Sequence, residues 1–115
     1  MDGNVEFEIK NGKGIIKKFN KNGKIRFEGE YLDGERNGKG KEYRNDDLIF
    51  EGEYLKGKRI GGKEYNEDGK LIFEGGYLDG KRNEKGKEYN YDSKLKFEGE
   101  YLNGKRWNGK VKEYH

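Results

Sequence analysis

One short motif recurs along this chain at a nearly constant interval, and no other feature of the sequence constrains the fold as strongly. The four copies of F-E-G-E-Y-L-x-G, the third with Gly in place of its second Glu, begin at Phe27, Phe50, Phe73 and Phe97. They are spaced by 23, 23 and 24 residues. A period of this length is typical of repeat proteins, in which each small unit buries its apolar surface against its neighbours.

A second block, which ends in K-E-Y, follows each copy of the motif. These second blocks end at Tyr43, Tyr65, Tyr89 and Tyr114. A more divergent unit precedes the four: its Val5 and Ile9 stand where the others have Phe and Tyr, and its Phe19 stands where the second block has Tyr. We therefore predict a single repeat domain, residues 1–115, of five units at about 4–24, 25–47, 48–70, 71–94 and 95–115.

The first block of each unit alternates with a period of two residues. In the first full copy Phe27, Gly29 and Tyr31 would point to one side of a strand, and Glu28 and Glu30 to the other. Such alternation, with many aromatic residues, indicates a strand rather than a helix. The second block carries lysines, so we expect opposite charges to face each other across neighbouring strands.

Turn-forming residues separate the blocks. Residues 33–38, Asp-Gly-Glu-Arg-Asn-Gly, are expected to form the turn within a unit, and Asn22-Gly23 a turn between units. Connections this short force neighbouring strands to be antiparallel. We predict an all-β fold: a single-layer, elongated, twisted antiparallel sheet of tandem β-hairpins, with about ten strands and a length of roughly 48 Å.

The composition agrees with one layer rather than two. Only 29% of the residues are hydrophobic and 43% are charged, too few apolar side chains for a two-layer core. Aromatic residues nevertheless reach 14%, and the net charge is only +3, which argues against a disordered chain.

The spacing of glycines and rings resembles a known family. The run Phe27-x-Gly29-x-Tyr31-x-x-Gly34, followed by x-x-Asn-Gly-x-Gly at residues 35–40, is similar to the membrane occupation and recognition nexus (MORN) repeat, Y-x-G-x-W-x-x-G-x-x-H-G-x-G. Phe stands for Tyr, Tyr for Trp and Asn for His. The third unit is one residue short, Glu84 replaces a turn glycine, and Trp107 looks like an insertion in the fifth unit.

The resemblance implies a single-layer sheet with a groove, and a role as a scaffold that binds proteins, dimerises or lies beside membrane-linked machinery. A variant of the repeat occurs in bacterial proteins described as antitoxins, and the E-Y-x-x-x-G-K-L stretches here are similar to it.

Two rows of side chains are candidate binding surfaces. The aromatic face comprises Phe27, Tyr31, Phe50, Tyr54, Phe73, Tyr77, Phe97 and Tyr101. The second strands add Phe19, Tyr43, Tyr65, Tyr89 and Tyr114. The rings either pack on neighbouring glycines or remain open to a partner. Alternation puts Tyr43 on the face of Lys39 and Lys41, so either the lysine stems cover the rings or a bulge shifts the register.

A basic row is the second candidate. Arg36, Arg59, Arg82 and Arg106 occupy the same position in successive units. They would bind the phosphates of anionic phospholipid, or they form a solvated edge that discourages strand pairing. The low net charge argues against nucleic acid.

We expect no enzyme, metal site, cofactor or small-molecule substrate. The only Ser is Ser93, the only His is His115, and Cys is absent, so a nucleophilic site has almost nothing to use. The sequence favours a cytoplasmic binding or scaffolding module for a protein partner or for self-association. The alternatives are a peripheral adaptor for anionic phospholipid and an antitoxin-like protein.

Overall fold

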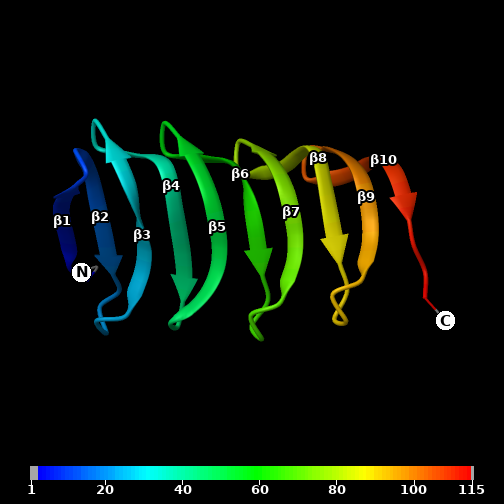
Figure 1. The fold of residues 1–115 in the computed structure, drawn as a ribbon, viewed down its shortest axis with the longest axis horizontal. Coiled ribbons are helices and arrows are strands. Elements are labelled where there is room, and N and C mark those ends of the chain that lie inside the picture. Colours follow the sequence, from blue (N-terminus) through cyan, green and yellow to red (C-terminus); the bar gives the residue numbers. More distant parts are fainter. Residues whose placement is uncertain (1–2, 115) are drawn as a thin grey trace.

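The computed structural model describes residues 3–114, and within that range the chain forms ten β-strands. These are β1 (Val5–Lys10), β2 (Lys13–Phe19), β3 (Ile25–Leu32), β4 (Glu35–Arg44), β5 (Asp47–Leu55), β6 (Lys58–Tyr65), β7 (Leu71–Leu78), β8 (Lys81–Tyr89), β9 (Leu95–Leu102) and β10 (Lys105–Val111). They lie in one antiparallel sheet in sequence order (Figure 1). The predicted single-layer sheet of tandem hairpins is confirmed.

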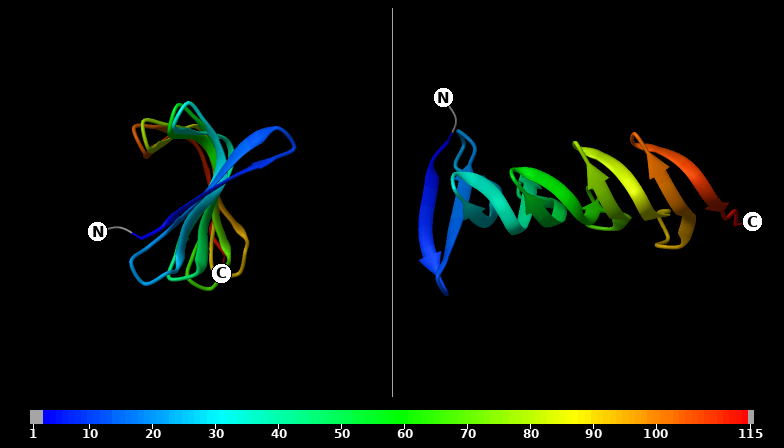
Figure 2. Two further views of the ribbon diagram at one scale, coloured as in Figure 1. Left: turned by 90° about the vertical axis from the view of Figure 1, so that its left-hand side faces the viewer. Right: turned by 90° about the horizontal axis from the view of Figure 1, so that it is seen from above.

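The sheet is long, narrow and strongly twisted. Its principal extents are 48 × 28 × 27 Å, so its long axis matches the length expected for ten strands side by side. The first hairpin, β1–β2, is turned relative to the later hairpins, and the turns within the later units curl over one side of the sheet (Figure 2). The first and last strands, β1 and β10, lie at opposite ends of the long axis (Figure 1).

The turns within units are all two residues long. Both residues of each turn have positive φ, as a type I′ turn requires. The turns are Asn11-Gly12, Asp33-Gly34, Lys56-Gly57, Asp79-Gly80 and Asn103-Gly104. The prediction of a turn over residues 33–38 is therefore wrong, because the turn ends at Gly34. Residues 35–38 belong to β4, because Leu32 pairs with Glu35 and a bulge in the β3–β4 ladder takes up the extra residues.

Three of the turns between units depend on an asparagine. The side-chain Oδ1 of Asn20 accepts the backbone N–H groups of Asn22 and Lys24 at 2.8 and 3.0 Å. Asn66 and Asn90 do the same in the later turns. The turn between β4 and β5 instead uses Asn45 and Asp46, both with positive φ.

A row of paired glycines crosses the sheet and explains its core. Within the described residues the row runs through Gly29, Gly40, Gly52, Gly62, Gly75, Gly86, Gly99 and Gly109, each opposite the next. A Cβ atom on Gly40 would lie 2.8 Å from both Phe27 Cζ and Tyr54 Cε1. The rings therefore lie directly on the backbone, as expected for strand glycines. Ile16 pairs with Gly29 and ends the row as a buried aliphatic side chain.

Candidate functional site

The rings of the aromatic face are buried. Seven of the eight are between 0 and 7% exposed, and Tyr31 is partly buried against them. Three of the Phe rings, Phe27, Phe50 and Phe73, also meet the Tyr of the next unit edge to face; the centroids of Phe27 and Tyr54, for example, are 5.5 Å apart. The two equivalent pairs in later units are 5.4 and 5.3 Å apart. Of the two alternatives for these rings, packing on glycine describes the structure, and the rings themselves offer little surface to a partner.

A carboxylate from one unit binds the Tyr and the Arg of the next unit. Glu42 in β4 accepts the hydroxyl of Tyr54, and it accepts Nε and Nη2 of Arg59 at 2.8 and 2.9 Å. Two later junctions repeat this arrangement. They use Glu64 with Tyr77 and Arg82, and Glu88 with Tyr101 and Arg106. Because the acceptor and the donors come from successive hairpins, each network ties two units together.

The networks shift the pKa values of their members. Burial alone would raise the pKa of the Glu64 carboxyl, but hydrogen bonds from Arg82 and Tyr77 outweigh burial and hold it below its usual value. At Glu88 the hydrogen bond from Arg106 is the largest cause, and it lowers the pKa to about 2. Burial and the hydrogen bond to Glu64 raise the pKa of Tyr77 far above its ordinary range. At neutral pH each network therefore contains an ionised carboxylate and a neutral tyrosine.

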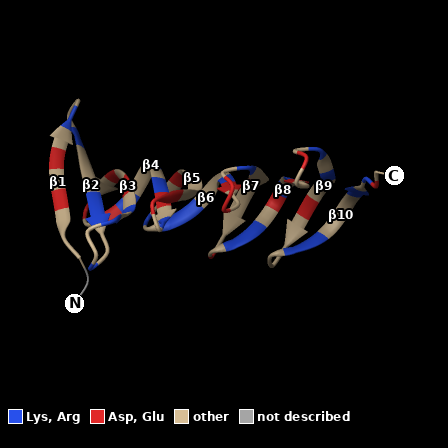
Figure 3. Cartoon of the chain, turned by 90° about the horizontal axis from the view of Figure 1, so that it is seen from below, with Lys and Arg blue, Asp and Glu red and all other residues tan. Residues whose placement is uncertain are grey.

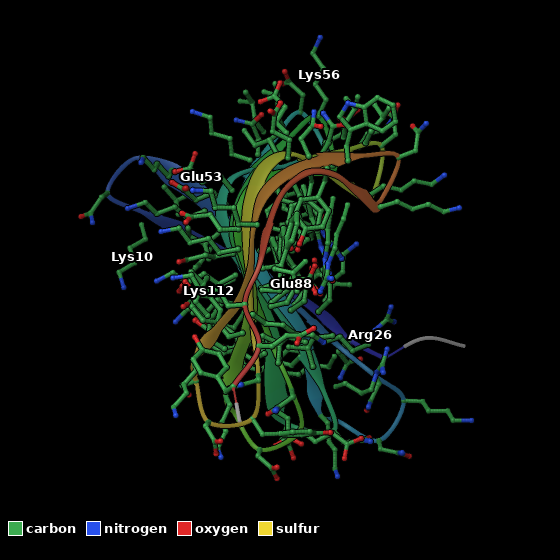
Figure 4. All side chains as sticks on the ribbon, turned by 90° about the vertical axis from the view of Figure 1, so that its right-hand side faces the viewer. Lys10, Arg26, Glu53, Lys56, Glu88 and Lys112 are labelled. Carbon is green, nitrogen blue, oxygen red and sulfur yellow. The ribbon has the colours of Figure 1, made fainter. Side chains whose placement is uncertain are left out.

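The four arginines of the basic row lie over the ring face rather than free at an edge. Their guanidinium carbons are 4.0 to 4.7 Å from the centroids of Phe27, Phe50, Phe73 and Phe97. Each has a carboxylate within 4.0 Å: Glu42 for Arg36 and Arg59, Glu64 for Arg82, and Glu88 for Arg106. In Figure 4, Glu88 lies on the side of the sheet toward which the turns curl, whereas Glu53 and Lys112 lie on the other. The arginines thus act first in packing and in charge pairing.

The second-strand tyrosines point to the other face. Tyr65 donates its hydroxyl to Glu51 at 2.5 Å, and Tyr89 donates to Glu74 at 2.5 Å. Burial and the charges of carboxylates on this face also raise the pKa of Tyr43. Phe19, the equivalent residue in the first unit, pairs with Ile25 and is partly buried. The bulges that the sequence left as an alternative do occur. Each register shift falls just before a second-strand tyrosine, at Tyr43, Tyr65 and Tyr89.

Tyr114 does not belong with the other second-strand aromatics. Gly109 pairs with Gly99, and Val111 pairs with Phe97, so Val111 takes the position that Glu42 has in its unit. Tyr114 lies beyond β10 and donates its hydroxyl to the Leu95 carbonyl at 2.7 Å. The alignment on K-E-Y was therefore wrong for the fifth unit, because the strand register follows the glycine.

Trp107 is also not an insertion. One residue separates Arg106 from Asn108, just as Ile60 separates Arg59 from Gly61 in the third unit. Both side chains are exposed.

The face opposite the rings carries rows of alternating charge. Glu28 pairs with Lys41, Lys41 with Glu51, and Glu51 with Lys63, and the alternation continues to β10. Figure 3 shows the bands of acidic and basic residues on neighbouring strands. The predicted charge pairing across the ladder is confirmed.

Sequence reasoning missed a row of exposed leucines. It consists of Leu32, Leu55, Leu78 and Leu102, which are 59, 50, 59 and 45% exposed. We call these four residues the leucine row. Each is the last residue of an odd-numbered strand, just before a type I′ turn, and alternation turns it away from the ring face. The signal was present, because each copy of the motif has Leu directly after Tyr.

The residues considered for catalysis remain apart from any cluster. Ser93 lies in the turn before β9, where its backbone N–H donates to the Asn90 carbonyl, and His115 lies outside the described residues. Residues 3–114 contain no group of three or more side chains suited to hold a metal ion. That part of the chain also has no helix able to cross a membrane.

Comparison with known families assigns the repeat. The model of the MORN repeat matches residues 27–48, 73–93 and 97–107. The third match ends at Trp107, in the segment between Arg106 and Gly109, which is one residue shorter than the segment from Arg36 to Gly40 in the second unit. The third unit has the same short segment and is not matched. A search of curated proteins finds no match to the chain. MORN repeats are in general modules that bind proteins or membranes. The three matched segments of this chain are therefore MORN repeats.

Proposed function

We propose that the chain is a non-catalytic scaffold that binds a protein partner along the leucine row. The observation that carries the proposal is the exposure of four equivalent leucines at one end of successive hairpins. Single exposed apolar residues are ordinary on protein surfaces, but a regular row of them is typical of an interaction site.

The spacing of the row suggests the shape of the partner. Successive leucines are two strands apart, which corresponds to about 10 Å across the sheet. Residues seven apart on an α-helix are about 10.5 Å apart along its axis. An amphipathic helix that lies across the hairpin ends could therefore place one apolar side chain against each leucine.

The ring face supports this role less well than the leucine row. Its rings are covered by arginines that are already paired with carboxylates, so a partner reaching them would have to break charged hydrogen bonds. The antitoxin-like alternative is a special case of protein binding, and it stays a prediction that rests on resemblance.

Binding of anionic phospholipid by the arginine row also stays a prediction, as does a location in the cytoplasm or at a membrane surface. The carboxylates beside the four arginines already pair with the guanidinium groups, which weakens the attraction of these side chains for a phosphate. Lys81 and Lys105 at the neighbouring turns are exposed and are better placed for such a role, whereas the exposed Lys58 pairs with Asp79 at 2.9 Å.

The test replaces all four leucines with Ser and compares proteins retained from a lysate of the source organism after crosslinking. The control replaces Ile60 and Tyr91, exposed apolar residues outside the row, with Ser. We expect specific partners to be lost with the leucine variant and kept with the control. Retention of the same partners by the leucine variant would refute the proposal. Sedimentation with anionic vesicles at physiological salt, lost on charge reversal of Lys81 and Lys105, would favour the lipid alternative.

A further inference from the structure

The two outermost strands expose large apolar side chains. In the strand order of the described residues β1 and β10 each have a neighbour on one side only. On β1, Val5, Phe7 and Ile9 are 47, 75 and 83% exposed, and on β10, Trp107 and Val111 are 65 and 56% exposed. A free edge strand with apolar side chains is a ready template for pairing with another strand.

The junctions inside the molecule define how β10 would meet β1. At the β6–β7 junction Gly62 pairs with Gly75, and the next pairs join Lys63 to Glu74 and Glu64 to Phe73. In β10 the residue equivalent to Gly62 is Gly109, since both pair with the glycine of the preceding strand.

The corresponding position in β1 is Phe7. It pairs with Ile16, which in turn pairs with Gly29, just as Gly29 pairs with Gly40 and Gly40 with Gly52. Applying the internal register to two copies therefore places Gly109 opposite Phe7. The pairs on either side become Lys110 with Glu6 and Val111 with Val5.

Side-chain chemistry fits this register on both faces. On the ring face Val111 meets Val5, the Phe7 ring meets a residue without a side chain, and Trp107 comes next to Ile9. On the other face Lys110 meets Glu6, which continues the alternation of Lys and Glu seen across the whole sheet.

The two edges also depart from the repeat in compensating ways. The internal junctions need a Glu on one side and a Tyr and an Arg on the other. Unit one has Ile9 in the Tyr position and Gly14 in the Arg position, since Ile9 pairs with Gly14 as Tyr31 pairs with Arg36. The Glu position of β10 is occupied by Val111, so neither edge leaves a charged group of the network without its partner.

We infer that two copies of this chain join head to tail, β10 of one pairing with β1 of the other in the register Gly109–Phe7, Lys110–Glu6 and Val111–Val5. The partner at these edges is a second copy, and the contact is separate from the leucine row. Because β1 and β10 lie at opposite ends of the long axis (Figure 1), the contact repeats into an open chain rather than closing into a pair.

Sedimentation velocity over a range of concentrations tests the charge pairing. Wild-type protein should form longer species as its concentration rises. Lys110→Glu alone and Glu6→Lys alone each place like charges together, and each should weaken association about tenfold. An equimolar mixture of the two variants restores opposite charges at every contact and should recover the wild-type behaviour. Lys56→Glu, an exposed charge reversal in a turn, is the matched control.

Disulfide trapping tests the register, because the chain has no cysteine of its own. A mixture of Val5→Cys and Val111→Cys proteins should form a covalent dimer on oxidation, since directly opposed side chains suit disulfide geometry. Ile9→Cys mixed with Val111→Cys is four residues out of register and should crosslink much less.

A monomer at all concentrations overturns the inference. So does association that ignores the charge reversals, or equal crosslinking by both cysteine pairs. The leucine-row variant should associate like the wild type, so failure of this inference and failure of the proposed function are distinguishable.

Discussion

The first junction between units differs from the three later ones in the side chains that surround its Tyr. In the later junctions a Glu that pairs with the following Phe binds the next Tyr and Arg. At the first junction Lys18 pairs with Phe27 in that position, and its Nζ lies 5.6 Å from the centroid of the Tyr31 ring. Tyr31 is only partly buried, whereas its three equivalents are nearly covered. Tyr31 lacks both the carboxylate and a Phe from the preceding unit, where Val5 stands, whereas Tyr54 has both contacts.

The same region differs in how its core is filled. Elsewhere a ring lies over a pair of glycines, but in β2 the corresponding residue is Ile16, which is 2% exposed. The Ile16 side chain therefore fills the space that, in the later units, is filled by a ring lying over a glycine.

The largest expected effect comes from adding a methyl group to the glycine row. In Gly52→Ala the new Cβ would lie 2.1 Å from the Gly61 carbonyl oxygen and 2.7 Å from Gly62 Cα, and backbone atoms cannot move aside cheaply. We expect a loss of about 3 kcal/mol in the free energy of unfolding, measured in urea. The control is Gly61→Ala, whose Cβ would have its nearest neighbour at 3.5 Å. Equal losses in the two variants would contradict the packing described here.

Removal of a network carboxylate should cost somewhat less. Glu64→Ala leaves the Tyr77 hydroxyl and the Arg82 guanidinium without their shared acceptor, so we expect a loss of about 2 kcal/mol in the same urea experiment. Glu67→Ala, an exposed change in the following turn, should have almost no effect. A loss no larger than that of the control would show that the network does not stabilise the junction.

The first junction should gain stability when it is made like the others. Lys18→Glu would place a carboxylate beside Tyr31 and Arg36, which pair as Tyr54 and Arg59 do. We expect a gain of about 1 kcal/mol in unfolding free energy, with reduced exposure of Tyr31 in hydrogen exchange or fluorescence quenching. Lys18→Ala is the control, because it removes the lysine without adding a carboxylate. An equal change in unfolding free energy for the two variants would refute a stabilising role for the carboxylate.

A smaller gain is expected from a turn residue. Glu84 has a φ of 61°, a left-handed conformation in which Gly38 lies in the second unit. Glu84→Gly should raise the free energy of unfolding by about 0.5 kcal/mol, because relief of strain exceeds the extra entropy of glycine in the unfolded chain. The reverse change, Gly38→Glu, should be destabilising, and a stable G38E protein would argue against backbone strain.

Acidification tests all three networks together. The pKa values of Glu42, Glu64 and Glu88 are lowered in the folded state, that of Glu88 to about 2 from an ordinary value near 4.5. The unfolded chain therefore binds protons more readily, so the networks stabilise the fold above about pH 4.5 and this contribution is lost as the pH falls toward 2. Thermal unfolding from pH 6 to pH 2 should show this decline. A variant with Gln at all three positions should show a flatter profile, and an unchanged slope would contradict the assignment.

The repeat and its alternation were enough to predict most of the fold. Rings and glycines two residues apart must share a face of a strand, and two-residue Asn-Gly or Asp-Gly turns permit only antiparallel neighbours. The same pattern predicted Glu opposite Lys across the ladder. The extent of the within-unit turn and the place of Tyr114 could not be predicted, because bulges and pairing decide which of several similar residues stands opposite a given glycine.

By itself, the sequence determined that this chain forms hairpins in one layer, since local periodicity specifies which side chains share a face. The tertiary structure alone decided that the rings are covered, that Arg59 reaches back 17 residues to Glu42, and that the leucines remain exposed. The physical reason is that burial and pairing depend on the twist and register between strands. These bring side chains of different units together, whereas alternation constrains only neighbours along one strand.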